Sequence, residues 1–178
     1  QGDALTGIAI SQIDYSDADR DVIGIGLQDN GIVLRDTAAG NWDRVDGGDG
    51  VEVTIVDGET GDIWYGNGVY DDPRPWRIFR EDAGDDTDTN NPDSGVWGVR
   101  MFFDVWNSIV YAFAGVNVIS IPEGSPTSGW STAIASPTGG QVRDVWGSLV
   151  DGDTLFVTYT DGNSRDLSIC RKSGASWN

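Results

Sequence analysis

The sequence predicts an all-β fold made of four similar units, each with four short antiparallel strands. The first observation is a segment, Asp104–Ser108 with sequence DVWNS, that returns about forty residues later as Asp144–Ser148 with sequence DVWGS. After each copy come an apolar run, a turn, a second strand-like run and a tryptophan. The second observation is the 25 glycines, which fit many turns better than long helices, because a glycine inside a helix costs about 1 kcal/mol.

The repeat extends backwards through the chain. An aspartate closes the first expected strand of every unit, and these residues are Asp14, Asp57, Asp104 and Asp144. A period of about forty residues with several short strands per unit is typical of the blades of a β-propeller. We therefore predict a single β-propeller domain over residues 1–178, with consecutive blades at residues 7–46, 50–94, 96–135 and 140–178.

The remaining strands follow each aspartate in order. Second strands are expected at residues 22–27, 63–66, 109–114 and 155–160, and third strands at 31–36, 76–80, 116–121 and 166–171. A fourth strand carries Trp42, Trp130 or Trp177 in three of the units. Short links between second and third strands, such as Asp29-Asn30-Gly31, contain residues that tolerate positive φ and so suit tight hairpins.

The second unit departs from this pattern. Residues 66–75 lengthen its hairpin, and residues 81–93 are rich in aspartate, asparagine and threonine. Such a polar segment does not match a buried strand, so we expect a mobile loop there.

Two ring sizes agree with four units. The blades form a closed four-bladed ring, or they belong to a larger ring whose other blades come from further sequence or from another copy, since propellers have about four to eight blades. Propeller rings commonly close by completing one blade with strands from both termini. The residues before Ile8 are few and glycine-rich, which favours the larger ring.

Charge restricts the partners. The net charge is −18, with 29 acidic and 11 basic residues, so the surface repels nucleic acid and anionic membranes. No apolar run is long enough to span a bilayer. We expect no nucleic-acid partner, no membrane insertion, and a location that is extracellular or on the surface of a cell or virus particle.

Side-chain chemistry restricts catalysis. The chain has no histidine, which excludes histidine-based triads and histidine metal ligands. Its one cysteine, Cys170, cannot form an intrachain disulfide, and its apolar neighbours predict a core position. Two carboxylates of a glycosidase would have to flank a sugar, and no aspartate pair in the sequence is specific enough to assign. We predict no catalytic residues.

The acidic surface has two explanations, solubility and binding of divalent cations. Calcium prefers carboxylate and carbonyl oxygens from a glycine-containing loop, and no segment has EF-hand spacing. The best candidate ligands for Ca²⁺ are Asp85, Asp86 and Asp88, and the alternative for them is a solvated acidic loop. No other cofactor is expected.

The repeated DVW segment has a structural explanation. The aspartate ends a strand and accepts hydrogen bonds from nearby backbone, and the tryptophan covers the gap between blades. Aromatic residues of the second unit have a different interpretation, because they gather beside prolines in its irregular hairpin. Aromatic faces next to polar side chains suit sugar rings or a protein partner. The predicted binding surface consists of Trp64, Tyr65, Tyr70 and Trp76.

Several turns carry a family resemblance. The segments Gln28–Gly31, Gly40–Trp42 and Gly47–Gly50 resemble the Asp-box, or BNR-type, propellers found in sortilin-like domains and xyloglucanase-like glycoside hydrolases. The segment Ser173–Trp177 keeps the Gly-x-Ser/Thr-Trp half of the Asp-box pattern, while Lys172 stands where the aspartate belongs. The resemblance implies a propeller in which the box is a structural turn. None of the catalytic aspartates of those hydrolases can be matched, so none is assigned.

Together these features predict a non-catalytic β-propeller module that binds a glycan or a protein or takes part in assembly. One alternative is a fragment of an Asp-box propeller glycoside hydrolase. Another is a structural subunit of a surface or viral assembly, which would self-assemble through open blade edges, because an unpaired strand edge can pair with another chain.

Overall fold

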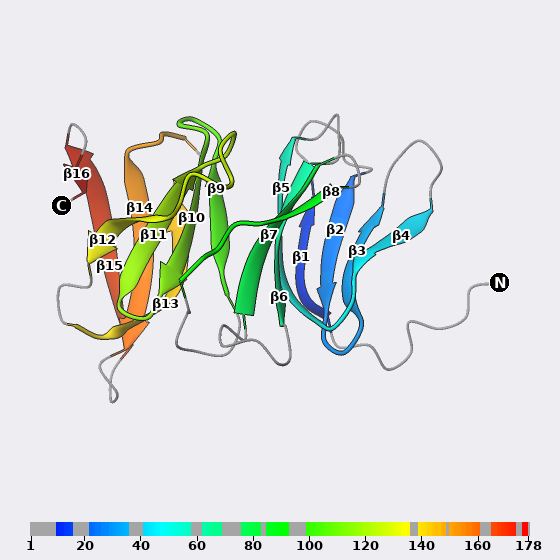
Figure 1. Ribbon diagram of the computed structural model, residues 1–178. Coiled ribbons are helices and arrows are strands. Elements are labelled where there is room, and N and C mark those ends of the chain that lie inside the picture. The colour runs from blue at the N-terminus through cyan, green and yellow to red at the C-terminus, as the bar shows by residue number, and fades with distance from the viewer. Residues whose placement is uncertain are drawn as a thin grey trace.

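The computed structural model describes residues 10–15, 22–35, 41–57, 62–68, 76–82, 85–92, 99–135, 139–148, 150–160, 165–173 and 176–177. Within these residues the chain forms 16 β-strands, arranged as 4 four-stranded antiparallel sheets (Figure 1). Each sheet takes its strands in chain order, so each is a simple up-and-down meander. The predicted all-β architecture of consecutive blades is confirmed.

We number the sheets as blades 1 to 4. Blade 1 contains β1 (Ile10–Tyr15), β2 (Ile23–Leu27), β3 (Gly31–Arg35) and β4 (Trp42–Asp46). Blade 2 contains β5 (Asp49–Asp57), β6 (Asp62–Gly68), β7 (Trp76–Asp82) and β8 (Asp85–Asp88). Blade 3 contains β9 (Met101–Asp104), β10 (Ile109–Ala114), β11 (Asn117–Pro122) and β12 (Ser131–Ala135). Blade 4 contains β13 (Gln141–Gly147), β14 (Thr154–Thr160), β15 (Arg165–Ser173) and β16 (Ser176–Trp177).

The polar segment of blade 2 was wrongly expected to be a loop throughout. Its residues Asp85–Asp88 form β8, the fourth strand, which pairs with β7. A strand at the edge of a sheet needs only its backbone to pair, and its carboxylates can remain at the surface. Just after β8 the buried side chains of Thr89 and Asn91 continue the pairing, because they bond to the carbonyl and amide of Ile78 at 2.7 Å each.

The blades lie face to face in one row, and Figure 1 shows blade 1 and blade 4 at opposite ends of it. The first strand of each blade contacts the first strand of the next, from β1 to β5, β5 to β9 and β9 to β13. These strands therefore form the inner side of an arc, and the described chain does not close into a ring.

Three apolar clusters fill the spaces between neighbouring blades. Glycines allow the sheets to approach closely. A side chain at Gly24 would collide with Val53 of the next blade, and one at Gly147 would collide with the ring of Phe102. Cys170 is buried in the cluster between blades 3 and 4, as predicted.

Tryptophans of the fourth-strand region close two of these junctions. Trp130, just before β12, meets Trp64 of blade 2 edge to face, with ring centroids 6.2 Å apart. Trp177 of β16 meets Tyr111 of blade 3 in the same way, with centroids 6.0 Å apart. In both cases the closing tryptophan of one blade packs on the second-strand aromatic residue of the blade before it.

In the repeated DVW segment, the predicted structural role holds for Asp104 but not for the tryptophans. The Asp104 carboxylate is buried and accepts hydrogen bonds from the backbone amides of Trp106 and Asn107, at 3.0 and 3.2 Å. The expectation that the tryptophans cover the gap between blades is wrong, since Trp106 and Trp146 are 60% and 66% exposed. Trp106 lies in the turn after β9, and Trp146 lies on the outer face of blade 4.

Candidate functional site

The aromatic residues predicted to bind a ligand do not form an exposed surface. Trp64 and Tyr65 are fully buried and Trp76 is 8% exposed, so the expected exposure of these three residues is wrong. Successive side chains of a strand point to opposite faces, and both faces of β6 are covered by neighbouring blades. Tyr70 lies outside the described residues. A binding role for these residues stays a prediction, and their burial does not favour it.

The hydroxyl of Tyr65 belongs to a structural network. It donates to Asp86 at 2.9 Å, and Asn67 donates to the Asp46 carboxylate at 2.7 Å. Burial and the carboxylates of Asp46 and Asp86 raise the pKa of Tyr65. The phenol therefore stays protonated and holds β4, β6 and β8 together.

The predicted calcium ligands lie in β8. Asp86 accepts the Tyr65 bond, and Asp88 forms an ion pair with Arg77 at 3.1 Å and accepts the Asn90 amide at 2.8 Å. The side chain of Asp85 lies outside the described part of the chain. Among described residues no group of three or more His, Cys, Asp or Glu is placed to hold a metal ion. Calcium binding at this strand stays a prediction.

Two of the segments that carried the family resemblance, Gln28–Gly31 and Gly47–Gly50, meet in space. The Asp29 amide donates to the Asp49 carboxylate at 2.8 Å, and a side chain at Gly50 would collide with the carbonyl of Gly31. Asp29 itself has a φ of 62°, which asparagine, aspartate and glycine tolerate best. These turns therefore join blade 1 to blade 2 and have a structural use.

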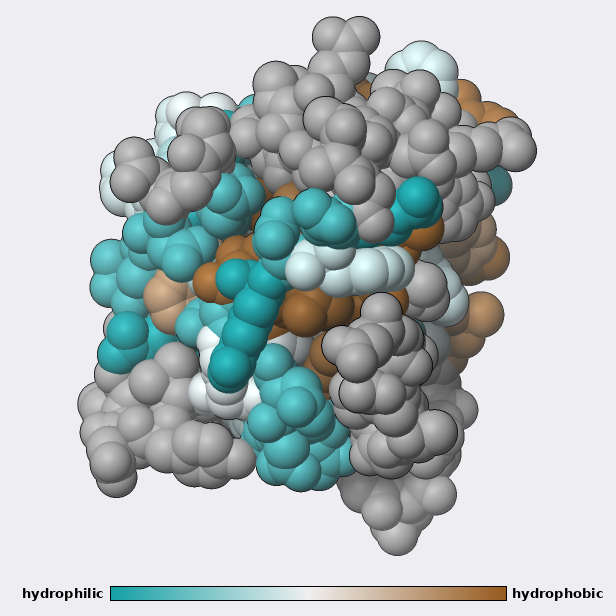
Figure 2. All heavy atoms as spheres, turned by 90° about the vertical axis from the view of Figure 1, so that its right-hand side faces the viewer, coloured by the Kyte–Doolittle hydropathy of each residue, from teal (hydrophilic) through white to brown (hydrophobic). Residues whose placement is uncertain are grey.

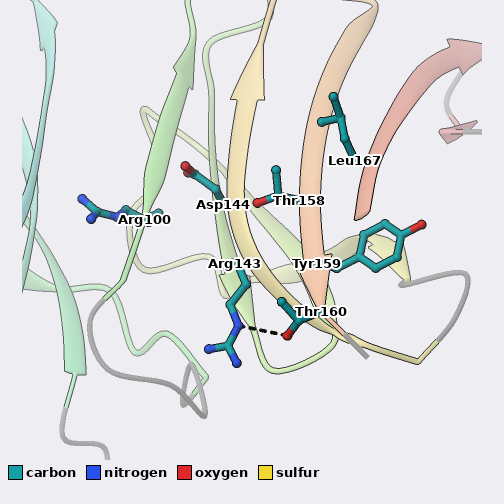
Figure 3. A pocket seen from close by; sticks show the side chains of 7 residues that line it. All are labelled: Arg100, Arg143, Asp144, Thr158, Tyr159, Thr160 and Leu167. Atoms are coloured by element: carbon teal, nitrogen blue, oxygen red, sulfur yellow. Dashed lines mark hydrogen bonds between the residues drawn. The ribbon is translucent and has the colours of Figure 1, made fainter. Parts of the chain in front are cut away.

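A cavity of about 570 Å³ opens on blade 4, beside the start of blade 3. Figure 3 shows that its side chains come from the segment before β9 and from β13, β14 and β15. Six of the lining residues have a side chain with a hydrogen-bonding group, and Leu167 is an exposed aliphatic residue: Arg100, Arg143, Asp144, Thr158, Tyr159, Thr160 and Leu167. This volume lies within the range of about 300–1,000 Å³ that is usual for small-molecule sites.

Two carboxyl groups flank Arg100 on the inner strands. The guanidinium of Arg100 bonds to the buried Glu52 of β5 at 2.7 Å. Asp144 of β13 interacts with the same arginine through its charge. In Figure 3 the carboxyl group of Asp144 points from β13 toward β9, and the guanidinium of Arg100 points away from it. Ionisable groups of three blades thus act on one another around Arg100.

Burial controls the protonation of both carboxyl groups. It raises the pKa of Glu52 to about 8, against the opposing effect of the hydrogen bond and charge of Arg100. It also raises the pKa of Asp144, while the Val145 amide, which donates to Asp144 at 3.0 Å, lowers it. Burial therefore favours the protonated form of Glu52 beside Arg100, while Asp144 acts on the same arginine from the cavity wall.

The other polar groups of the cavity are held in place. The Nε atom of Arg143 donates to the Thr160 hydroxyl at 3.2 Å, as drawn in Figure 3. The hydroxyls of Tyr159 and Ser168 are bonded at 2.9 Å. Arg143 is left out of the ladder by a bulge between Val142 and Asp144, so its side chain reaches the cavity mouth.

Sequence reasoning missed this cavity. It assigned Asp144 a purely structural role, by analogy with Asp104 in the other copy of the repeat. The usable signal was the residue before it: Arg143 precedes the second DVW copy, whereas Phe103 precedes the first. The pairing of Arg100 with Glu52 joins residues far apart in the sequence, and no local pattern indicates it.

Comparisons with known proteins define the fold and leave the chemistry open. Three solved structures are similar to the chain: a GH74 enzyme from Niastella koreensis (TM-score 0.62, 12% identity), an auxiliary nutrient binding protein from Bacteroides ovatus (0.65, 12%) and a GH74 xyloglucanase from Xanthomonas campestris (0.64, 14%). The alignments cover 94%, 94% and 93% of this chain, and 30%, 40% and 29% of those chains. The chain therefore spans well under half the length of the proteins it resembles.

In sequence, the chain matches neither a protein-family model nor a curated protein. The Asp-box repeat accordingly stays a prediction. Within the described residues, no helix has the length and apolar character needed to cross a membrane.

Proposed function

We propose that the protein is a non-catalytic β-propeller module that works outside the cell or on a particle surface and binds a glycan in the cavity of blade 4. The observation that carries the proposal is the lining of this cavity. Carboxylate, guanidinium and hydroxyl groups match the paired donors and acceptors of sugar hydroxyls, and Leu167 offers apolar contact to a ring face.

The similar structures support the same class of ligand. One is named as a nutrient binding protein and another as a xyloglucanase. Their identities of 12% and 14% are low, so they support this proposal only through the shared fold. The net charge of −18 adds a restriction, because it favours neutral over acidic sugars.

A set of neutral and acidic soluble polysaccharides tests the proposal, with binding measured by titration calorimetry and affinity electrophoresis. We expect at least one neutral glycan to bind. Asp144→Asn should weaken its binding by roughly tenfold or more, the cost of a hydrogen bond to a charged group, and Thr158→Ala by roughly two- to tenfold, the cost of a neutral hydrogen bond. Asp151→Asn is the matched control, because Asp151 lies in the same blade, is exposed and is absent from the cavity lining. Failure of every glycan to bind would overturn the proposal.

A second function is favoured by one specific observation. Glu52 and Asp144 are carboxyl groups of raised pKa on the inner strands that both interact with Arg100 of the cavity wall, and a glycoside hydrolase needs one protonated and one ionised carboxyl group. If the chain is a fragment of such a hydrolase, reducing ends are released from a polysaccharide, and Glu52→Gln or Asp144→Asn abolishes the release. Retention of a glycan without turnover supports the binding module instead.

A further inference from the structure

The two ends of the arc carry complementary halves of an aromatic junction. At the internal junctions, Trp130 covers Trp64 and Trp177 covers Tyr111, and the covered rings are at most 1% exposed. Blade 4 also has an aromatic residue on its second strand, Phe156, but no following blade of the described chain covers it. Phe156 is 36% exposed.

The opposite half is found at the other end of the arc. Trp42 is the first residue of β4 and so belongs to the fourth-strand region of blade 1, as Trp130, just before β12, and Trp177, at the end of β16, belong to that of their blades. In the described chain no blade precedes blade 1, and Trp42 is 47% exposed. The junction between blades 1 and 2 lacks both halves. Its second strand β2, with sequence IGIGL, has no aromatic residue, and its fourth strand β8, with sequence DDTD, has no tryptophan to cover one.

The faces around these residues are apolar as well. On blade 4, strand register places Trp146, Phe156 and Ile169 in one row across β13, β14 and β15. All three are exposed, as is Leu167 in the adjacent row. The alternate residues, such as Val145 and Val157, face blade 3 and are buried. Blade 4 therefore has one covered face and one open face, on which an apolar row lies beside the cavity residues Asp144 and Thr158.

Blade 1 has the corresponding outer face. Gly24 and Gly26 of β2 lie on the side of blade 2, so Ile23 and Ile25 point away from blade 2, and Val33 is paired with Ile25 on the same face. Ile25 is buried on this face, whereas Ile23 and Val33 are partly exposed. Figure 2 looks onto this end of the molecule and shows apolar surface between hydrophilic side chains.

We propose that the open face of blade 4 binds blade 1 of a second copy of this chain, with Trp42 of the second copy packed on Phe156. Two such junctions, related by a twofold axis, join two arcs of four blades into one closed ring of eight. This is the upper end of the usual range of about four to eight blades, so two copies complete a ring and three exceed it. Asp144, Thr158 and Leu167 lie beside the contact, and the second copy would form the missing wall of the cavity. The inference does not depend on the ligand proposed above.

Sedimentation velocity of the 178-residue chain over a range of concentrations tests the association. We expect a species of twice 19.1 kDa that does not grow further at higher concentration. Trp42→Glu and Phe156→Lys should each give a monomer, while Val150→Lys, an exposed residue in a turn of blade 4, should remain a dimer. All three substituted residues are exposed or half-exposed, so each variant should keep its circular dichroism spectrum.

Mixing the two monomeric variants provides the sharper test. A mixed dimer has one native junction, in which Trp42 of one variant packs on Phe156 of the other. Its second junction brings together the two substituted side chains, which carry opposite charges, so dimers should return. A wild-type chain that stays monomeric would overturn the proposal. So would a mass that rises without limit, which indicates an open filament, or a mixture that remains monomeric.

The same variants separate the head-to-tail contact from a symmetric one. If Phe156→Lys abolishes the dimer and Trp42→Glu does not, the two open faces of blade 4 bind each other, and the proposed contact between blade 4 and blade 1 is wrong.

Discussion

The enclosed junctions between blades and the two open ends of the arc carry the same kind of aromatic residues, which are covered in the junctions and partly exposed at the ends. Inside the arc, Trp64 and Tyr111 are covered by tryptophans of the following blades. At the ends, Phe156 on a second strand and Trp42 on a fourth strand are partly exposed. The comparison shows that these aromatic residues are enclosed where a neighbouring blade covers them, and that the ends are where contacts with other molecules can form.

Truncating an enclosed ring should have the largest effect on stability. Trp64→Ala is expected to lower the free energy of unfolding by about 3–5 kcal/mol, because it leaves a cavity between blades 2 and 3. Phe156→Ala, measured in the monomer, should cost under about 1 kcal/mol, since its ring is partly in water already. Urea denaturation followed by fluorescence measures both losses of unfolding free energy. Equal losses would show that enclosed and open aromatic residues do not differ in their contribution to stability.

A buried carboxyl group should give the next largest effect, seen in the pH dependence of stability. The pKa of Glu52 is raised from 4.5 to about 8 by burial, so between these pH values the unfolded chain loses a proton that the folded chain keeps. Stability should therefore fall as pH rises from about 5 to about 8, by up to about 1.4 kcal/mol for each unit of pKa difference.

Glu52→Gln should remove this part of the pH dependence and stabilise the chain most at pH 8. Asp151→Asn is the control, because its exposed side chain reports only the general effect of removing one negative charge. Denaturation of the three proteins at pH 5, 6.5 and 8 makes the comparison. A Glu52→Gln curve parallel to that of the wild type would show that the buried group does not titrate as described.

Adding a methyl group where two blades approach closely should have a smaller effect on the free energy of unfolding. Gly147→Ala should cost about 1–3 kcal/mol, because its methyl group would collide with the Phe102 ring between blades 3 and 4. Gly124→Ala should change stability by less than about 0.5 kcal/mol, since open space surrounds that position. Thermal unfolding by calorimetry distinguishes them, and a neutral Gly147→Ala would mean that the junction can widen freely.

The smallest difference in stability is expected between alanine substitutions of the aspartates in the two copies of the DVW repeat. Asp104 is buried and accepts two backbone amides, so Asp104→Ala should cost about 1–3 kcal/mol. Asp144 accepts one backbone amide beside the cavity, and Asp144→Ala should cost about 1 kcal/mol or less. If the order is reversed in urea denaturation, Asp144 has a structural role that the cavity does not explain.

The blade order was predictable because it depends on local signals. Aspartates at strand ends, hairpin residues such as Asp29 with its φ of 62°, and a period near forty residues each act over short distances. Burial of Trp64 was not predictable, because it depends on which blade covers which face. A prediction made from one unit treated its aromatic residues as surface, whereas the neighbouring blades cover them.

The strand β8 and the cavity show two further limits. Asp85–Asp88 lacks every apolar signal of a strand and pairs through its backbone, and one asparagine and one threonine side chain continue the pairing. The cavity depends on Arg100 and Asp144, which come from different blades, and on a bulge that turns Arg143 outward. Neither a contact between blades nor a bulge has a sequence signature of its own here.

Hydroxyl-radical footprinting, read residue by residue by mass spectrometry, tests the distinction between enclosed and open junctions most directly. In dilute protein, we expect rapid oxidation of Trp42, Trp146 and Phe156 and slow oxidation of Trp64 and Tyr111. In concentrated protein, oxidation of Trp42 and Phe156 should slow markedly while that of Trp106, in the turn after β9, stays fast. Slow oxidation of Phe156 at every concentration, or rates at Trp42 and Phe156 that do not respond to concentration, would contradict the distinction between enclosed and open junctions.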